Sequence, residues 1–493
     1  MPNNQKSISK NYIYNTILKV LNIVFPMVTF PYIARILNAS GIGKINFSVS
    51  IISYFILISR IGIPMYGIRE CAKHRDDKEK LTKTVQEILI INFGSLILTL
   101  ILFYIILFNS AILINYKDIL LILSINIVST SIGIEWFYQA VEEYKYITLR
   151  NIFVKVVSLI LIFLLIRDES DYNLYAFILV ISVSLSYIYN FIHSRNYINL
   201  FKRYSSYDFK RHIKPILLLF AMSVSVSIYT NLDKVMLGIL SGDEAVGYYT
   251  SANKMIKSII VLVTSLGTVL LPRISYYIKN NQIEEVNRLI NKSLNFILLM
   301  AIPAAIGVFM LAKSIIIIFA GGEYMEAITT IKILSPVIIV IAIGNLFGVQ
   351  ILISYGKEKL TLISTSIGAI SNFLLNFLLI PQFQHNGAAL STLIAEFLVM
   401  ITQFYFSYSY IKDIKKNIKF ENIFHYVEGS ILIIITCLII NKLINNILIV
   451  TVLSILFSIA IYFSFLFLIK NEFVYEIKEK ITSKFNNRIK ELL

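Results

Sequence analysis

Charged side chains inside apolar stretches are the residues of this sequence best able to do chemistry. Seven cations lie in stretches of that kind, at Lys19, Arg60, Lys155, Lys234, Lys254, Lys257 and Lys332. The clear acids in comparable positions are Glu135, Asp233 and Glu396. A charge within a bilayer is costly unless it faces water, a partner or a ligand. The excess of cations therefore predicts a positively charged aqueous interior that binds an anion.

Lys254 and Lys257 are the most informative pair, because residues three apart share one face of a helix. Two like charges on one face repel, and an anion or an aqueous lumen makes that arrangement tolerable. We therefore predict a central cationic, substrate-binding cavity formed by Lys254, Lys257, Lys19 and Lys155. The alternative is that the lysines extend to the lipid headgroups, which stays open above all for Lys19.

Three further charges are candidates for gating or salt bridges. Arg60 and Glu135 both lie near the inner ends of their apolar stretches. They either pair as an inner latch or each reach the membrane interface separately. Asp233 falls at nearly the depth of Lys254 on the next antiparallel stretch, so a salt bridge between them and a substrate role are both open.

The sequence contains no pattern typical of an enzyme or of a metal site. There is no phosphate-binding glycine loop and no HExxH motif, and the five histidines are scattered without metal-ligand spacing. We therefore expect no catalytic residues, no metal and no cofactor. Cys71 and Cys437 are most simply interpreted as unpaired thiols.

The elements that must position these charges follow from composition. Of 493 residues, 57% are hydrophobic and 15% charged, against about 45–50% and about 25% in soluble domains. A soluble enzyme is excluded, and an all-α polytopic membrane protein is predicted. Apolar runs of about 20 residues predict 14 transmembrane helices, at 12–36, 42–63, 85–109, 118–139, 147–166, 173–194, 216–240, 246–271, 286–311, 327–352, 357–380, 388–411, 425–444 and 446–469.

The distribution of Lys and Arg predicts the orientation of these helices. If the N-terminus is cytoplasmic and the helices alternate, 32 Lys and Arg fall on the cytoplasmic side and six on the opposite side. Such a bias is typical of the positive-inside rule and predicts that both termini are cytoplasmic. Because most of the net charge of +16 is explained by topology, it does not indicate a nucleic-acid partner.

A weak internal repeat predicts the domain organisation. Residues 146–150 resemble 359–363, and 173–176 resemble 386–389, both at an offset of 213. Six helices separate the matching segments, so the two copies would be parallel, although chance matches of this quality also occur. We predict an N-lobe of helices 1–6 at 1–200, a C-lobe of helices 7–12 at 201–412, and helices 13–14 with a basic cytoplasmic tail at 413–493.

Several short motifs together resemble those of Wzx-type oligosaccharide flippases, which belong to the multidrug/oligosaccharidyl-lipid/polysaccharide superfamily. They are Phe30-Pro31-Tyr32-Ile33-Ala34-Arg35, Gly62-Ile63-Pro64-Met65-Tyr66-Gly67-Ile68-Arg69-Glu70, Glu135-Trp136-Phe137-Tyr138-Gln139, Leu232-Asp233-Lys234-Val235-Met236-Leu237-Gly238, Val246-Gly247-Tyr248-Tyr249, Tyr355-Gly356-Lys357 and Asn386-Gly387-Ala388-Ala389. Arg60 departs from the resemblance, since a small or apolar residue is expected there, and it is a candidate feature of this chain's substrate.

The resemblance implies two six-helix lobes, alternating access, and a location in the bacterial cytoplasmic membrane. It implies as substrate an undecaprenyl-diphosphate-linked glycan, moved from the inner to the outer leaflet for surface polysaccharide assembly. Membrane lipids are the other expected partners, and H⁺ and Na⁺ are the candidate coupling ions. Bending of the first helix, which contains Pro26 and Pro31, would exchange the two states. The alternatives are a drug or cation antiporter of the same superfamily and a membrane glycosyltransferase or polysaccharide polymerase.

Overall fold

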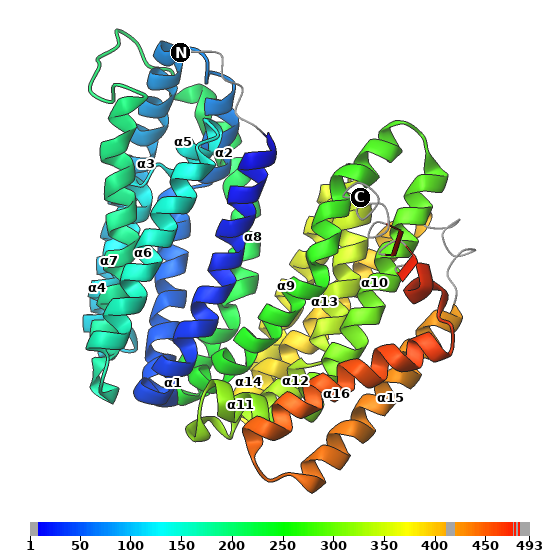
Figure 1. The fold of residues 1–493 in the computed structure, drawn as a ribbon. Helices are drawn as coiled ribbons and strands as arrows, with labels where there is room; N and C mark the ends of the chain where they lie inside the picture. The colour runs from blue at the N-terminus through cyan, green and yellow to red at the C-terminus, as the bar shows by residue number, and fades with distance from the viewer. Residues whose placement is uncertain (1–7, 411–419, 477, 480–481, 484–493) are drawn as a thin grey trace, which may run out of the picture. The chain divides into compact units, whose positions relative to one another are not determined.

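A computed structural model describes residues 8–410, 420–476, 478–479 and 482–483 of the chain. Every regular element in these described ranges is helical, and none of them contains a strand (Figure 1). This confirms the all-α class predicted from composition.

Eight α-helices precede residue 241 in the described part of the chain. They are α1 (Ile8–Arg60), α2 (Ile63–Ala72), α3 (Lys78–Asn109), α4 (Lys117–Ile132), α5 (Glu135–Ala140), α6 (Tyr144–Leu165), α7 (Tyr172–His193) and α8 (Lys210–Leu240). The later helices are α9 (Asp243–Lys279), α10 (Ile283–Met310), α11 (Ala312–Phe319), α12 (Ala327–Leu334), α13 (Val337–Asn345), a π-helix (Leu346–Ile353), α14 (Glu358–Ser407), α15 (Phe420–Leu443) and α16 (Ile447–Leu468).

The described part of the chain has the predicted number of helical segments long and apolar enough to cross a membrane. Eleven helical segments of the described part are long and apolar enough to cross a membrane. Two of them each contain two spans, because α1 breaks at Asn38 (φ 55°) and α14 breaks at Gln384 (φ 47°). The 31-residue α8 adds one more, with residues 215–232 free of charged side chains. Both breaks fall in the short gaps predicted between apolar runs, and the total is fourteen.

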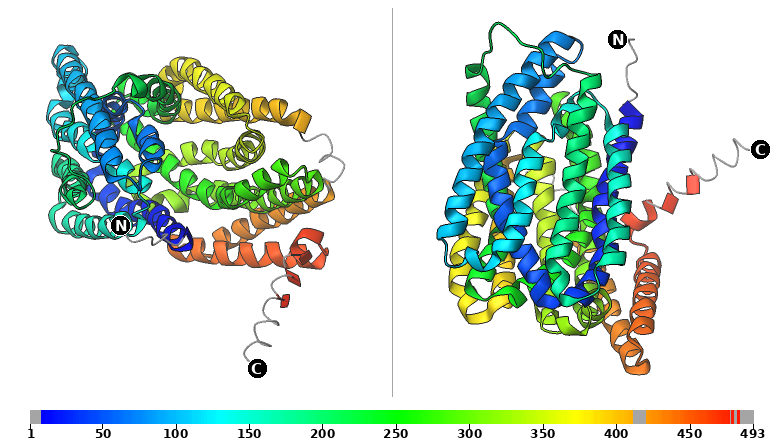
Figure 2. Two further views of the ribbon diagram at one scale, coloured as in Figure 1. Left: turned by 90° about the horizontal axis from the view of Figure 1, so that it is seen from above. Right: turned by 90° about the vertical axis from the view of Figure 1, so that its left-hand side faces the viewer.

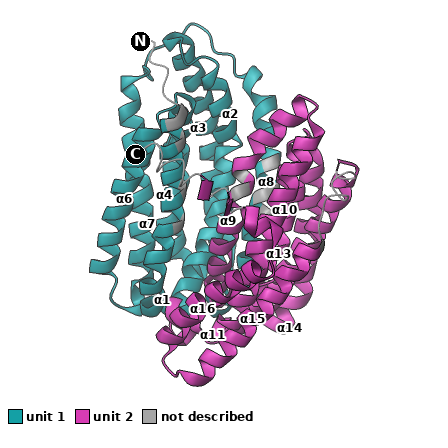
Figure 3. Ribbon diagram, turned by 45° about the vertical axis from the view of Figure 1, so that its right-hand side comes forward, with its two compact units in different colours: residues 1–247 teal, residues 248–493 magenta. Residues whose placement is uncertain are grey.

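The chain divides into two compact units, Met1–Gly247 and Tyr248–Leu493 (Figure 3). Within unit 1 the long helices run side by side (Figure 2), and α1 packs against α3, α4, α6 and α8. The long α1 therefore carries its side chains into the interior of unit 1. The division into lobes at 1–200 and 201–412, with helices 13–14 appended at 413–493, stays a prediction.

The turn between α1 and α2 fixes the end of the second span. Gly62 has φ +76°, and a Cβ atom there would lie 2.6 Å from the carbonyl oxygen of Ile216 and 2.6 Å from the amide nitrogen of Phe220. Glycine is the residue that combines this backbone conformation with so close an approach. The turn therefore packs directly on the backbone of α8.

In unit 2, α15 and α16 pack on each other and α15 also packs on α10. The buried residues of this contact include Tyr426, Cys437 and Tyr462. The hydroxyl of Tyr462 donates to the carbonyl oxygen of Leu299 at 3.0 Å, which joins α16 to α10. A phenol in an apolar interior needs such a partner, so this bond fixes the position of α16 on its unit.

Candidate functional site

Lys155 on α6 contacts α1, and both helices belong to unit 1. Its Nζ donates to Oδ1 of Asn22 on α1 at 2.7 Å and to the carbonyl oxygen of Leu21 at 3.4 Å. The ammonium also lies 5.1 Å from the ring centre of Phe25. Lys155 is therefore half-buried against α1. Lys19 lies on the same helix, and its side chain is outside the part that the structure describes.

Lys254 and Lys257 both lie on α9, three residues apart, in unit 2. Lys254 is half-buried, whereas Lys257 is exposed. The structure places them on one face of a helix, as their spacing indicated. Since Lys19 and Lys155 belong to unit 1, the cavity shared by all four lysines stays a prediction.

Glu135 pairs with Arg150, and no ion pair joins Glu135 to Arg60 in the described part of the chain. Nη2 of Arg150 donates to Oε2 of Glu135 at 2.8 Å, and the Arg150 side chain is 5% exposed. The other terminal nitrogen, Nη1, donates to Oδ1 of Asn190 on α7. The first residue of α5 is thus joined to α6 and α7 through one buried guanidinium.

Arg60 instead lines a small pocket within unit 1. The pocket has a volume of about 220 Å³ and is formed by the end of α1, the start of α2 and α8. Arg60 is the one charged residue among those that line it, and Ser53, Ser223 and Ser227 supply hydroxyls. Among the residues that the structure describes, none forms an ion pair with Arg60. The pocket is therefore positively charged, which suits a small anionic group.

Asp233 is buried on α8. It lies close enough to Tyr54 on α1 to act on that phenol electrostatically. Lys254, its predicted salt-bridge partner, belongs to the other unit. Both alternatives for Asp233, a salt bridge and a substrate role, stay predictions.

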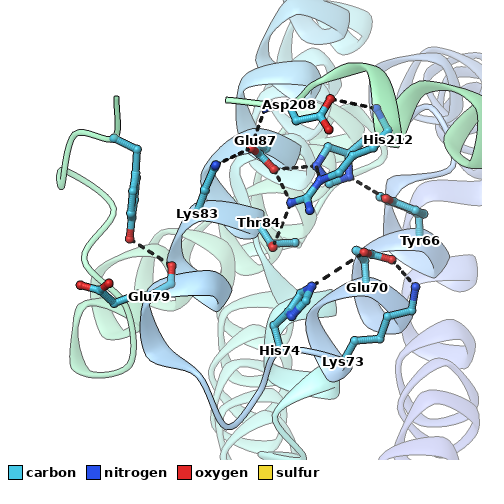
Figure 4. A network of polar contacts seen from close by, with 12 residues as sticks. Tyr66, Glu70, Lys73, His74, Glu79, Lys83, Thr84, Glu87, Asp208 and His212 are labelled. Atoms are coloured by element: carbon cyan, nitrogen blue, oxygen red, sulfur yellow. Dashed lines mark hydrogen bonds and ion pairs between the residues drawn. The ribbon is translucent and has the colours of Figure 1, made fainter. Parts of the chain in front are cut away.

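A second polar cluster, the Glu87 network, joins α3 to the start of α8 (Figure 4). The Glu87 side chain is fully buried, and its Oε2 accepts from Nη2 of Arg211 at 2.6 Å and pairs with Nε2 of His212 at 2.8 Å. Its Oε1 accepts from the backbone N–H of Asp208 at 2.8 Å. A buried carboxylate is tolerated when its lone pairs are occupied in this way. The network therefore holds the entry of the chain into α8.

The network extends to α2 and to the loop before α8. Nδ1 of His212 is 2.6 Å from the hydroxyl of Tyr66. Nε2 of Gln86 donates to the carbonyl oxygens of Leu200 at 3.0 Å and Lys202 at 2.8 Å. These contacts satisfy backbone groups of an irregular segment, so the loop between α7 and α8 is fixed in unit 1.

Two exposed groups between the spans have shifted pKa values. The backbone N–H of Lys80, followed by its ammonium, donates to Asp77 at the start of α3 and lowers the pKa of that carboxyl. The hydrogen bond from Lys202 to Glu79 raises the pKa of the Lys202 ammonium. Both contacts lie at the end of unit 1 that carries the Glu87 network.

Glu87, Arg150 and His212 are not among the site residues predicted from the sequence. Glu87 falls two residues inside the predicted span 85–109, and Arg150 falls three residues inside 147–166. A charge in the first turn of an apolar run is a signal that could have identified them. Within the described ranges, no three His, Cys, Asp or Glu side chains are placed to hold a metal ion.

Within the described ranges, apolar helices long enough for fourteen crossings, with ionic side chains in their interior, are typical of a multi-span membrane transporter. The model of the polysaccharide biosynthesis protein family matches residues 8–278, more than half of the chain, and the chain belongs to this family. The MatE family model matches residues 219–378.

Relatives and solved structures agree with this assignment. A protein of Escherichia coli (strain K12) named "Putative O-antigen transporter" is 26% identical over 81% of this chain and 96% of its own length. A Staphylococcus aureus protein named "Capsular polysaccharide biosynthesis protein CapF" is 24% identical over 80% of this chain and 98% of its own. The inward-closed structure of the lipid II flippase MurJ has a TM-score of 0.75 at 16% identity, over 92% of this chain and 98% of MurJ. The last likeness shows the fold alone.

Proposed function

We propose that this protein is a flippase that moves a lipid-linked oligosaccharide across the cytoplasmic membrane of a bacterium. The substrate would be a glycan on undecaprenyl diphosphate, carried from the inner to the outer leaflet for a surface polysaccharide. The observation that carries the proposal is the near full-length similarity to a protein named for O-antigen transport. The similarity to CapF points to the same process.

The charges suit a diphosphate substrate. Arg60 lines a pocket of about 220 Å³ without an ion-pair partner among the described residues, and Lys254 and Lys257 share a face of α9. An arginine presents a planar fork of donors that matches phosphate oxygens. In this proposal Lys19, Lys155, Lys254 and Lys257 hold the diphosphate in a cavity between the lobes at 1–200 and 201–412. The lobes would alternate between inward-open and outward-open states, with H⁺ or Na⁺ as the coupling ion and both termini in the cytoplasm.

The second candidate is a drug or cation antiporter, which the match to the MatE model favours. Such an antiporter needs an acid in its first lobe for the coupling ion. The two interior acids noted in 1–200 are engaged, Glu87 by Arg211 and His212 and Glu135 by Arg150. This arrangement favours the flippase.

Deletion of the gene in its own host tests the proposal. We expect the surface polysaccharide to disappear and the lipid-linked oligosaccharide to accumulate on the inner leaflet, out of reach of an impermeant lectin in intact spheroplasts. A plasmid copy should restore both. Unchanged surface polysaccharide, together with increased sensitivity to cationic drugs, would support the antiporter instead.

A further inference from the structure

An apolar groove runs along the outside of unit 1 between α6 and α7. It encloses about 670 Å³, within the range of sites that hold small molecules. Aliphatic and aromatic residues form most of its walls, among them Phe153 and Leu161 on α6 and Ile181 and Leu185 on α7. Phe153 is 69% exposed and Leu185 57%, so the groove opens away from the core of unit 1.

The groove has the length of about one leaflet. Its α6 wall runs from Tyr146 to Leu161, which corresponds to about 22 Å along a helix axis at about 1.5 Å per residue. Its α7 wall runs from Ile181 to Ile192, about 16 Å by the same measure. Half of the hydrocarbon core of a bilayer is about 15 Å thick. A single acyl chain aligned with the two helices would therefore fill the groove.

One mouth of the groove is aromatic and basic. The ring of Tyr146 stacks on that of His193, with centroids 4.3 Å apart and planes 8° from parallel. This stacking brings together the first turn of α6 and the last turn of α7. Lys145 directly precedes Tyr146, and Arg195 follows His193 by two residues; both are exposed.

Neither of these two cations forms an ion pair with a nearby acid of the described chain. Glu142 pairs with Arg75 at 2.7 Å, and Glu143 accepts from the hydroxyl of Tyr197 at 2.7 Å. Among the described residues, neither Lys145 nor Arg195 has an ion-pair partner. The predicted topology puts this mouth at the cytoplasmic surface, where basic residues between transmembrane helices attract anionic lipid headgroups.

We propose that the α6–α7 groove binds one anionic phospholipid of the inner leaflet. One of its two acyl chains lies along Phe153 and Leu185, and its phosphate lies between Lys145 and Arg195. A polyprenyl phosphate has the same chemistry, but its chain is longer than an acyl chain and would extend past Leu161. The groove lies wholly within unit 1, so the proposal is independent of the transported substrate.

Native mass spectrometry of the full-length protein, titrated with phosphatidylglycerol or phosphatidylcholine, tests this site. Phosphatidylglycerol should bind in preference. Each cation contributes about 1 kcal/mol near an anionic lipid, so Lys145→Gln with Arg195→Gln should weaken its binding about 30-fold. The matched control, Lys279→Gln with Lys359→Gln, removes two exposed cations of unit 2 and should change nothing. Equal binding of the two lipids, or equal loss in both double variants, would overturn the proposal.

A variant that fills the groove tests the binding of the acyl chain separately from the binding of the headgroup. Val157 lines the groove, so Val157→Trp should abolish tight binding of the lipid. Ile101→Trp on the exposed face of α3 should leave this binding unchanged. Elution volume on gel filtration checks that each variant is folded. If undecaprenyl phosphate displaces phosphatidylglycerol from the wild type and is itself lost in Val157→Trp, the occupant is the polyprenyl carrier and the phospholipid assignment is wrong.

Discussion

Nη2 of Arg150 on α6 lies 2.8 Å from Oε2 of Glu135, the first residue of α5. The same guanidinium reaches Asn190 on α7 through Nη1. One side chain therefore joins three helices at the end of unit 1 where the chain turns from α4 into α5. Removing one partner of such a buried pair leaves an uncompensated charge in the interior.

Arg150→Gln should destabilise the protein by about 3 kcal/mol, the lower end for a broken buried pair, because Glu135 keeps some access to solvent (23% exposed). The exposed Arg167 provides the control, since Arg167→Gln should cost less than about 0.5 kcal/mol. Thermal unfolding in detergent, followed by gel-filtration fluorescence, measures both.

A charge exchange then distinguishes contact from proximity. Glu135→Arg combined with Arg150→Glu should recover part of the stability that each single change loses, whereas Glu135→Arg combined with Arg60→Glu should give additive losses. If stability recovered in the second pair but not in the first, the result would support the latch between Arg60 and Glu135 that the sequence suggested.

Glu87→Gln should also destabilise the protein by about 3 kcal/mol. The change removes the buried charge that Arg211 and His212 face. Glu79 offers a matched control. Its partner Lys202 lies in the loop between α7 and α8, as Asp208 does, but the Glu79 side chain is 74% exposed. Glu79→Gln should cost less than about 1 kcal/mol. Limited proteolysis of the loop at 197–209 gives the second measurement, and equal cleavage of both variants would contradict a role for Glu87 in fixing this loop.

The sequence predicted the helices better than the contacts between them, for physical reasons. An apolar run of about 20 residues has to form a helix in a bilayer. The short gaps between such runs therefore predicted the helix breaks at Asn38 and Gln384. Arg150 and Glu135 are 15 residues apart, on different helices, and Glu87 and Arg211 are 124 apart. Such pairs depend on how the helices pack, which the spacing of residues in a single sequence does not reveal.

Gly62→Ala should destabilise the turn between α1 and α2 by about 1–3 kcal/mol, the usual cost of a left-handed backbone at a non-glycine residue. The clash with the carbonyl oxygen of Ile216 at 2.6 Å adds to this loss. Gly94 within α3 is the control, because no atom lies within 4 Å of the position that a Cβ atom would take there. Gly94→Ala should be neutral or stabilise by about 0.5–1 kcal/mol. A Gly62→Ala protein that unfolds at the wild-type temperature would contradict the tight packing on α8.

Lys254→Gln with Lys257→Gln should abolish export of the surface glycan while the protein still inserts into the membrane. The reason is the loss of both positive charges from one face of α9. Lectin staining of intact cells measures export, and immunoblots of the membrane fraction measure insertion. Lys279→Gln with Lys359→Gln, which changes two exposed cations of the same unit, should leave export intact. Normal export by the first double variant would remove the diphosphate-binding role of the pair.

The last prediction concerns orientation, which follows from the excess of Lys and Arg on one side of the spans. Single cysteines at Lys44 and Arg167 should react with an impermeant maleimide from outside the cell. Those at Asp77 and Lys359 should react only after permeabilisation. The background is Cys71→Ala with Cys437→Ala, two buried thiols that form no disulfide. All four target side chains lie between or at the ends of spans, so each should be reachable from one side.

The four positions test the helix count as well as the direction. Lys44 follows the break at Asn38, and Asp77 precedes α3, so one crossing separates them. Arg167 follows α6, whereas Lys359 lies at the start of α14, and these two should also lie on opposite sides. If all four cysteines reacted from the side opposite to the one expected, the positive-inside assignment would be wrong, but the count of fourteen spans would be unaffected. If Lys44 and Asp77 reacted from the same side, the break at Asn38 would not separate two crossings, and the count of fourteen would fail.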